Sequence, residues 1–404
     1  MQEENFIVRE PLLNAQERVL GYKLAWQRRT SSGANPSDAD ARALANFVTG
    51  QFGGTEEGAS LGDQILFLPI TPELFSGEVF SGLPKKRTVL VVQAADLINA
   101  DRTTAVKVLR AQGYGISLRG THPATTDKGL LSCATHIEIS CAASDFAEQV
   151  RQYRALDLES VHLVGCDITD WQQYDLCAAM GMDAFAGNLH LTPRPQDQPR
   201  ELTPAQAMIL ELMEMVKNGE DVRQLESVLK RDAALSYRLL RYINSAGFGL
   251  GCEIQSLRHA VTLLGYSPLY RWLALLMATS TTTGYSPVLM QTAVIRGRFA
   301  ELLGTGFLPK SEAENIFVAG MFSLLDRLLG IPMEEVLEKI QLSDAVSEAM
   351  LSREGIYGPF IALAEACELN AEDISSMAGN LCVSEEQVNQ AHLSAIAWAQ
   401  ILHL

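Results

Sequence analysis

Short apolar runs alternate with longer helix-like segments over the first half of the chain. From the fourth run onward, the starts lie 26, 21, 25 and 23 residues apart, which leaves room for one strand, one crossover helix and two loops. The first two runs start only 13 residues apart, too few for a helical crossover, so we expect an antiparallel hairpin there. The pattern predicts an α/β fold, an irregular (β/α)8 barrel with a hairpin start. The eight predicted strands are 6–8, 19–26, 65–70, 89–93, 115–118, 136–140, 161–165 and 184–189.

Polar residues in front of three segments predict where barrel helices begin. Asp101, Ser144 and Asp170 are the expected N-caps, and the helices that they would cap span residues 103–112, 145–156 and 171–180.

The alternation stops near residue 190. Residues 192–199 hold three prolines and no hydrophobic period, which predicts a linker. Beyond it the pattern is helical throughout, with helix starts expected at Thr203-Pro204, Ser256, Ser267-Pro268 and Ile331-Pro332, and a capping box formed by Ser384 and Gln387. We therefore expect two domains, an α/β barrel over residues 1–195 and an all-α domain over 196–404.

Composition narrows the class of protein. The 404 residues are 47% hydrophobic and carry a formal net charge of −16, which argues against nucleic-acid binding through phosphate contacts. The seven cysteines include no CxxC pair, so we expect reduced, mostly buried thiols. The acidic N-terminus is unlike a signal peptide, and the most apolar stretch, 272–278, is too short to span a membrane. These features predict a soluble cytoplasmic protein.

Few metal ligands are expected at the carboxyl ends of the predicted strands, where barrel enzymes place their reactive groups. Of the side chains at the ends of the last six strands, Asp167 is the one carboxylate, while Asp96, Asp170 and His122 lie slightly beyond, in the loops. Arg119 at one of these ends would repel a divalent cation. The sequence therefore predicts neither a metal nor a cofactor.

Three segments of the first half resemble the EAL domain, the cyclic di-GMP phosphodiesterase barrel. They are residues 8–26, 113–118 and 185–193, and the likeness covers roughly residues 5–195. Several positions depart from the family's metal-binding pattern. Lys23 replaces the signature glutamate, Glu138 replaces a lysine that helps to activate water, and Arg119 with Gly120 replaces paired aspartates. The resemblance thus implies a degenerate barrel without two-metal catalysis. The other departures are Pro69, Gln93, Asp167 or Ile168, and Ala186.

Residues 229–247 and 254–265 resemble the HDOD domain, a helical relative of the HD phosphohydrolases that lacks their metal motif. The chain contains no His-Asp dipeptide, Leu325 precedes Asp326 where that pair would fall, and Arg296 or Arg298 stands at the earlier histidine position. The whole chain therefore resembles the bacterial EAL–HDOD signalling proteins.

Six residues are candidate contacts for a partner or ligand: Lys23, Arg119, Asp232, Asn244, Ser245 and Arg296. Each also has a structural interpretation, which we favour. Lys23 and Arg119 either form an anion site or neutralise Asp167 and Glu10. Asp232 either contacts a partner or caps a helix.

The remaining candidates are weighed in the same way. Asn244 and Ser245 either bind a ligand or form a turn. Arg296 and Arg298 either hold a phosphate or lie on a solvated helix face paired to Glu301.

The resulting hypothesis is a non-catalytic bacterial signal-transduction protein, not an enzyme, that acts through protein–protein interaction with other signalling proteins. The resemblance implies regulation of motility, biofilm or stress linked to cyclic di-GMP. Two alternatives stay open. One is a receptor that binds cyclic di-GMP without cleaving it, and the other is a weak phosphodiesterase whose metal shell uses Asp96, Asp167, Asp170 and His122.

Overall fold

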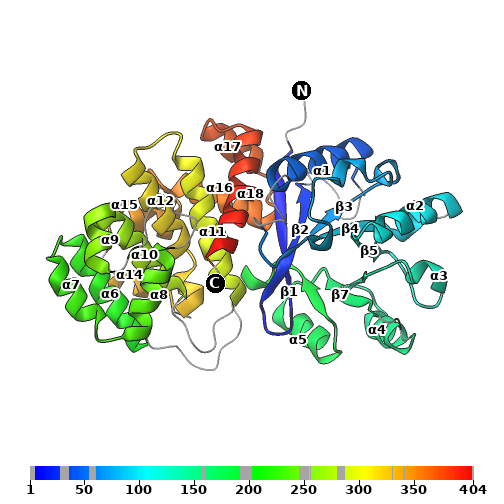
Figure 1. Cartoon of the computed structure of the whole chain (residues 1–404), viewed down its shortest axis with the longest axis horizontal. Helices are drawn as coiled ribbons and strands as arrows, with labels where there is room; N and C mark the ends of the chain where they lie inside the picture. Colours follow the sequence, from blue (N-terminus) through cyan, green and yellow to red (C-terminus); the bar gives the residue numbers. More distant parts are fainter. Residues whose placement is uncertain are drawn as a thin grey trace. The chain divides into compact units, whose positions relative to one another are not determined.

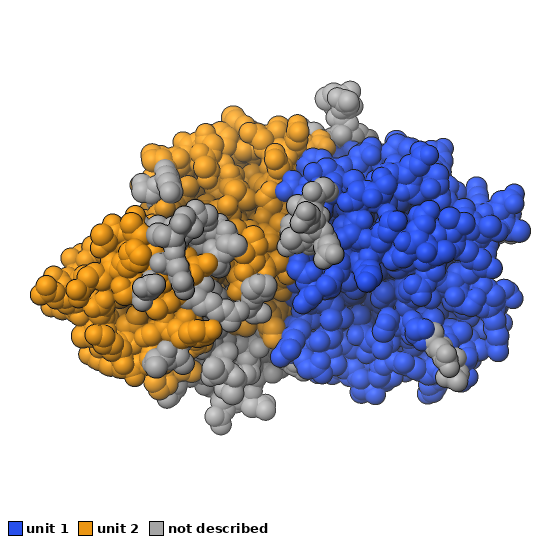
Figure 2. Space-filling view, in the orientation of Figure 1, with its two compact units in different colours: residues 1–194, 367–372 blue, residues 195–366, 373–404 orange. Residues whose placement is uncertain are grey.

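The structure is a computed structural model, and it divides into two compact units. Unit 1 comprises Met1–Arg194 with Cys367–Glu372, and unit 2 comprises Pro195–Ala366 with Asp373–Leu404 (Figure 2). The residues that the structure describes are 5–27, 36–53, 61–97, 99–156, 158, 160–191, 203–244, 254, 256–279, 287–329, 331–339 and 342–402. The predicted linker at 192–199 lies outside the described residues.

Unit 1 contains a closed barrel of eight strands in sequence order (Figure 1). β1 runs antiparallel to both of its neighbours, β2 and β8, while every pair from β2 to β8 is parallel. The predicted irregular (β/α)8 barrel and its hairpin start are thereby confirmed. The strands are β1 (Ile7–Leu13), β2 (Val19–Trp26), β3 (Ile65–Pro69), β4 (Thr88–Gln93), β5 (Gly115–Arg119), β6 (His136–Ser140), β7 (His162–Cys166) and β8 (Ala184–Ala186).

Helices on the outer side of the strands complete the barrel (Figure 1). They are α1 (Asp38–Phe52), α2 (Ala100–Ala111), α3 (Lys128–Leu131), α4 (Phe146–Ala155) and α5 (Trp171–Ala179). Between β3 and β4 the structure has three 3₁₀ turns instead of an α-helix, Pro72–Leu74, Glu78–Phe80 and Lys85–Arg87. Two further 3₁₀ segments are Ala94–Leu97 and Asn188–Leu191.

The expected caps of these helices are partly wrong. Asp170 caps α5 as predicted, because its side chain accepts a hydrogen bond from the Gln173 amide. Helix α2 is capped by Asn99, which places Asp101 in the first turn of the helix. Helix α4 follows Asp145 and not Ser144. An acidic residue favours both the cap and the first turn, so the pattern cannot separate the two positions.

Alternate residues of the strands fill the barrel interior. The buried cluster combines large and small side chains, from phenylalanine to alanine. Its members are Leu12, Phe67, Val89, Val91, Val164, Cys166, Ala184 and Ala186. Residues two positions along a strand from these members point the same way.

Unit 2 is helical over its described residues, as the sequence predicts. Its helices are α6 (Pro204–Lys217), α7 (Val222–Leu229), α8 (Ala233–Ile243), α9 (Leu257–Leu264), α10 (Tyr266–Thr279), α11 (Pro287–Gly304), α12 (Lys310–Phe322), α13 (Leu325–Leu329), α14 (Met333–Lys339), α15 (Asp344–Ser352), α16 (Gly358–Leu369), α17 (Ile374–Asn380) and α18 (Glu385–Ile401). The last three residues of α16 belong to unit 1.

Most of the predicted helix starts of unit 2 are confirmed. Thr203 and Ser384 each form a capping box, and Ser256 caps α9. The start expected at Ser267 is wrong, because α10 begins at Tyr266 and Ser267 lies inside its first turn.

Helices α11 and α12 pack closely at two glycines. A Cβ atom added to Gly320 would lie 2.9 Å from the Cα atom of Gly297, and one added to Gly297 would lie 2.6 Å from the Phe317 carbonyl oxygen. Any side chain here would force the helices apart. The contact makes α11 a central helix, with most of its residues buried on all sides.

Candidate functional site: a charged cluster inside the barrel

An ion pair crosses the interior of the barrel between β2 and β6. The Lys23 ammonium Nζ lies 2.8 Å from Oε2 of Glu138, and the two side chains are 14% and 1% exposed. Glu138 also accepts a hydrogen bond from the Ser117 hydroxyl at 3.1 Å. The pair adjoins the interior apolar cluster, because Lys23 Nζ lies 3.5 Å from the Cys166 sulfur.

Arg119 extends the cluster toward solvent. Its Nε lies 3.9 Å from Glu138 Oε2, and its Nη2 lies 3.7 Å from an oxygen of Asp167. Parallel pairing of β5 with β6 sets Arg119 beside Glu138. Ser140 donates a 2.6 Å hydrogen bond to Asp167. The side chains of Arg119 and Asp167 are 42% and 48% exposed, so this end of the cluster faces water.

The charges of the cluster stabilise one another. Burial alone would raise the pKa of Glu138, but the Lys23 ammonium and the Arg119 guanidinium outweigh it and lower that pKa. Burial alone would lower the pKa of Lys23. The negative charges of Cys166 (when ionised), Glu138 and Glu10 outweigh burial and raise that pKa. Lys23 and Glu138 are therefore both charged at neutral pH.

Glu10 is the exception within the cluster. It lies opposite Lys23 in the register of β1 with β2. Burial raises the pKa of Glu10 against the attraction of Lys23, and Glu138 adds to the rise. Lys23 thus makes its close ion pair with Glu138, across the barrel, instead of with Glu10 as the sequence analysis expected.

Of the six candidate contacts, the structure brings together Lys23 and Arg119, which both lie beside Glu138. The others belong to unit 2. Asp232 accepts a hydrogen bond from the Leu235 amide at 2.9 Å, which is the capping geometry that the sequence favours. Asn244 bonds both backbone groups of Ile254, and it therefore ties the residue after α8 to residue 254. Ser245 lies outside the described residues.

The expectation for Arg296 is wrong. We expected a solvated helix face, yet the residue is 2% exposed. Its Nη1 donates to the Ser323 hydroxyl at 2.8 Å and to Glu365 at 2.6 Å. Arg353 binds the same Glu365 carboxylate through two nitrogens, each at 2.8 Å. The partners come from distant segments of the chain, which a helix pattern cannot reveal.

Arg298 follows the expectation better, since it pairs with Glu301 at 2.7 Å. The sequence analysis missed that Arg271 binds the same carboxylate at 2.6 and 2.9 Å. Arg271 also stacks on the Phe317 ring, 4.3 Å from its centroid. Buried Glu301 and partly buried Glu365 thus bind four arginines within unit 2. Glu138 was noted as a departure from the EAL pattern but was not among the candidate contacts, although the reversed charges at positions 23 and 138 were a usable signal.

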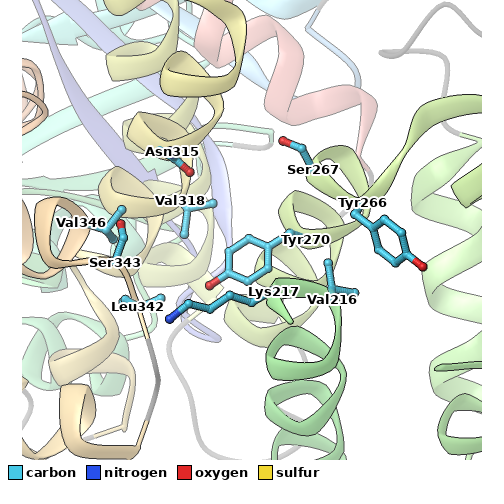
Figure 3. Close-up of a pocket in the computed structure, with 10 residues that line it drawn as sticks. All are labelled: Val216, Lys217, Tyr266, Ser267, Tyr270, Asn315, Val318, Leu342, Ser343 and Val346. Carbon is cyan, nitrogen blue, oxygen red and sulfur yellow. The ribbon is translucent and has the colours of Figure 1, made fainter. Parts of the chain in front are cut away.

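Unit 2 also contains a cavity of about 230 Å³ between the end of α6, α10, α12 and the start of α15. Figure 3 shows the Lys217 side chain and the Tyr270 hydroxyl pointing in the same direction, toward Leu342. Burial raises the pKa of Tyr270 to about 12, so the phenol is neutral and can donate a hydrogen bond. The apolar lining includes Val216 and Val318.

The described part of the chain has neither a cluster of metal-binding side chains nor a helix fit to span a membrane. No group of three or more His, Cys, Asp or Glu side chains there is placed to hold a metal ion. None of the helices there combines the length and the apolar character that crossing a membrane requires.

Comparison with known proteins gives matches over both halves. Residues 202–349 match the HDOD domain family. The chain is 25% identical to the cyclic di-GMP phosphodiesterase CdgJ of Vibrio cholerae, over 98% of this chain and 92% of that protein. It is 24% identical to the uncharacterized protein YuxH of Bacillus subtilis, over 98% of both chains.

A solved structure is also similar, with a lower sequence identity. It is the YkuI protein of Bacillus subtilis, which has an EAL domain and was solved with cyclic di-GMP and calcium. The identity is 15%, the TM-score is 0.36, and the match covers 65% of this chain and 73% of that one. A closed barrel with EAL-like strand motifs, followed by an HDOD domain over residues 202–349, gives the chain the organisation of an EAL–HDOD signalling protein.

Proposed function

We propose that this chain is a regulator in bacterial cyclic di-GMP signalling that acts by binding other proteins and does not hydrolyse the nucleotide. The link to cyclic di-GMP rests on the EAL–HDOD organisation and on the similarity to CdgJ along nearly the whole chain. The absence of hydrolysis rests on one observation, the buried ion pair between Lys23 and Glu138.

The residues of the cluster do not fit the divalent cations that the EAL family implies. Such cations need several oxygen ligands with negative charge. Here the carboxylate of Glu138 is already bound by Lys23 at 2.8 Å, and Arg119 lies 3.9 Å from the same oxygen. A divalent cation at Glu138 would stand beside an ammonium group and be repelled by it.

Releasing Glu138 to a metal would also leave Lys23 without its partner. Breaking a buried pair in this way costs about 3–5 kcal/mol, which opposes metal binding further. We therefore derive no hydrolytic step through a metal in this barrel.

The helical unit supports the same proposal. The resemblance sets Arg296 or Arg298 where the HD phosphohydrolases carry a metal-binding histidine. Arg296 is engaged with Ser323 and Glu365, and Arg298 with Glu301. A guanidinium cannot ligate a metal, because it has no free lone pair and stays protonated. Both units thus hold internal ion pairs where catalytic relatives would hold ions, which leaves their outer surfaces for function.

A receptor for cyclic di-GMP is a second candidate, favoured by Arg119. Its guanidinium is 42% exposed, and its ion-pair distances of 3.7 and 3.9 Å are long. A side chain held this loosely can turn to bind a phosphate through two nitrogens. The receptor would bind the nucleotide at the open end of the barrel and leave it intact.

Turnover and binding assays on the full chain separate these functions. With cyclic di-GMP and either Mg²⁺ or Mn²⁺, we expect no linear product by chromatography, whereas an active EAL enzyme in the same buffer should give complete turnover. Turnover by the purified chain that disappears in Asp167→Asn would overturn the proposal, since a contaminating enzyme would not respond to that change.

Calorimetry tests the receptor. Binding that Arg119→Ala weakens at least tenfold, while Arg151→Ala on the exposed face of α4 leaves it unchanged, would establish the receptor. Absence of binding at high micromolar nucleotide would remove it.

The protein-binding part of the proposal needs a partner that can be purified. After affinity capture from the native cell, the complex is remade from the two pure proteins. Charge reversal at exposed Lys230, within the HDOD domain, should weaken that complex. If no captured protein binds directly once purified, this part of the proposal is wrong.

A further inference from the structure

Two cysteine side chains of unit 1 meet beside the charged cluster. The sulfur atoms of Cys141 and Cys177 lie 3.3 Å apart. Cys141 directly follows β6, and its amide donates a 2.9 Å hydrogen bond to the Cys166 carbonyl, which fixes its backbone against β7. Cys177 lies on α5, the helix between β7 and β8.

Gly165 on β7 lies beside the two sulfurs. A Cβ atom at this position would lie 3.5 Å from each of them, an ordinary van der Waals contact. A disulfide requires sulfurs about 2.05 Å apart, so the pair needs only a further approach of about one ångström, which side-chain rotation can supply.

The two thiols differ in access. Cys177 is fully buried, whereas Cys141 is partly exposed. A reagent from solution can therefore reach Cys141 first, and Cys177 stands behind it at the distance of a resolving thiol. The other described cysteines lack this arrangement. Cys133 donates to the Gly129 carbonyl, and Cys166 faces Glu138 and Lys23.

We propose that Cys141 and Cys177 are an oxidisable dithiol, converted to an intramolecular disulfide by exchange with a low-molecular-weight disulfide. In the first step, Cys141 loses its proton to solvent, against a pKa that its hydrogen bond with Cys177 and burial raise, and the resulting thiolate attacks one sulfur of the reagent. A mixed disulfide forms at Cys141, the reagent's S–S bond breaks, and one small thiol leaves, taking up a proton. In the second step, the Cys177 thiolate attacks the Cys141 sulfur and expels the second small thiol. Two protein thiols are oxidised and one small disulfide is reduced to two thiols.

The new bond would join the loop after β6 to α5. Ser140, next to Cys141, donates its hydroxyl to Asp167 in the charged cluster. The disulfide would therefore form next to Ser140, the residue that contacts the exposed end of the charged cluster. This inference is independent of the proposed function, because it holds whether or not the barrel binds a nucleotide.

Peptide mapping of the full-length protein tests the proposal. The reduced chain is incubated with glutathione disulfide, alkylated and digested with a protease that cuts before aspartate. Cys177 is then the sole cysteine of peptide 175–182, and Cys141 shares peptide 127–144 with Cys133. We expect these two peptides to be linked, with a mass lower by two hydrogen atoms than the sum of the free peptides.

Three variants complete the design. Cys141→Ser should abolish the link, whereas Cys133→Ser, the matched control on the same peptide, should leave it intact. Cys177→Ser should trap a stable glutathione adduct at Cys141. The proposal is overturned if no link forms at a concentration that fully modifies exposed Cys382, if the link survives Cys141→Ser, or if no adduct forms in Cys177→Ser.

A thermal measurement guards against variants that do not fold. Oxidised wild-type protein should unfold at a midpoint several degrees above that of the reduced protein, since the bond closes a long loop. The Cys133→Ser variant should show the same rise and Cys141→Ser should show none. An equal midpoint for oxidised and reduced wild type would contradict the formation of this bond.

Discussion

Lys23 and Glu138 stand 115 positions apart in the sequence and form a buried ion pair 2.8 Å long. This relationship shows how two opposite charges are accommodated inside the barrel. Two isolated charges inside a barrel would be costly, whereas a matched pair with a hydroxyl partner at Ser117 is satisfied.

Removal of the ammonium should therefore destabilise the barrel strongly. We expect Lys23→Met to lower the free energy of unfolding by about 3–5 kcal/mol, because Glu138 loses its partner while 1% exposed. Denaturant unfolding of the full chain measures the change. The matched control is Arg151→Met, which removes an exposed pair with Glu148 and should cost below about 1 kcal/mol. Equal losses for the two variants would contradict the importance of the interior pair.

A double-mutant cycle gives the coupling of the pair directly. Glu138→Gln alone leaves the Lys23 ammonium buried, so it too should be costly. The combined variant Lys23→Met with Glu138→Gln removes both charges and should lose less stability than the sum of the single changes, by at least about 1 kcal/mol. Additive losses would show that the two side chains do not stabilise each other.

Stability should also depend on pH through His136 on β6. Burial, with His162 nearby, lowers the pKa of His136 to about 4, against about 6.5 in an unfolded chain. Between these values the unfolded state binds a proton that the folded state does not. The stability is therefore fully present above pH of about 6.5, and it falls by on the order of 3 kcal/mol as the pH drops to about 4.

The variant His136→Gln isolates this contribution. Its unfolding free energy should fall less than that of the wild type across the same interval, when both are measured by denaturant titration at several pH values. Identical pH dependence in the two proteins would mean that His136 is not the group responsible.

The helical unit offers a comparison between two arginines on one carboxylate. Arg296 and Arg353 both bind Glu365, with side chains 3% and 26% exposed. Arg296→Met should lower the unfolding free energy by about 1–3 kcal/mol, because Ser323 and Glu365 each lose a hydrogen bond from a guanidinium that is 3% exposed. Arg353→Met should cost less, since water can replace that guanidinium. The reverse order would contradict the roles that burial assigns.

Local signals predicted the architecture well, and their failures have physical reasons. Strand positions and capping boxes depend on neighbours in sequence, so the barrel and most helix starts could be inferred. The first strand was expected over 6–8 but runs from Ile7 to Leu13, because Glu10 and Pro11 interrupt its apolar pattern. Inside the barrel Glu10 is tolerated through Lys23 on the neighbouring strand, which no local rule detects.

The candidate site was less predictable, since it depends on contacts between distant segments. Sequence comparison singled out Lys23, Arg119 and Glu138 as separate departures from a family pattern. It could not show that Lys23 and Arg119 both lie within 4 Å of one carboxylate oxygen of Glu138. The prediction for Arg296 was wrong for a related reason. Most residues of helix α11 are buried, and Arg296 pairs with Glu365 inside the unit.

Asn244 allows the structural and ligand-binding interpretations to be separated. Its Nδ2 donates to the Ile254 carbonyl at 2.8 Å, and its Oδ1 accepts from the Ile254 amide at 2.7 Å. If these bonds are its role, Asn244→Ala should lower the unfolding free energy by about 1–3 kcal/mol. Asn244→Asp should be at least as destabilising at neutral pH, because a carboxylate oxygen then faces a carbonyl oxygen. A protonated carboxyl can donate that hydrogen bond, so the aspartate variant should recover relative to the alanine variant as the pH falls toward about 4. If the unfolding free energies of the two variants instead change with pH in the same way, the hydrogen bond to the Ile254 carbonyl is not the reason for an asparagine at this position.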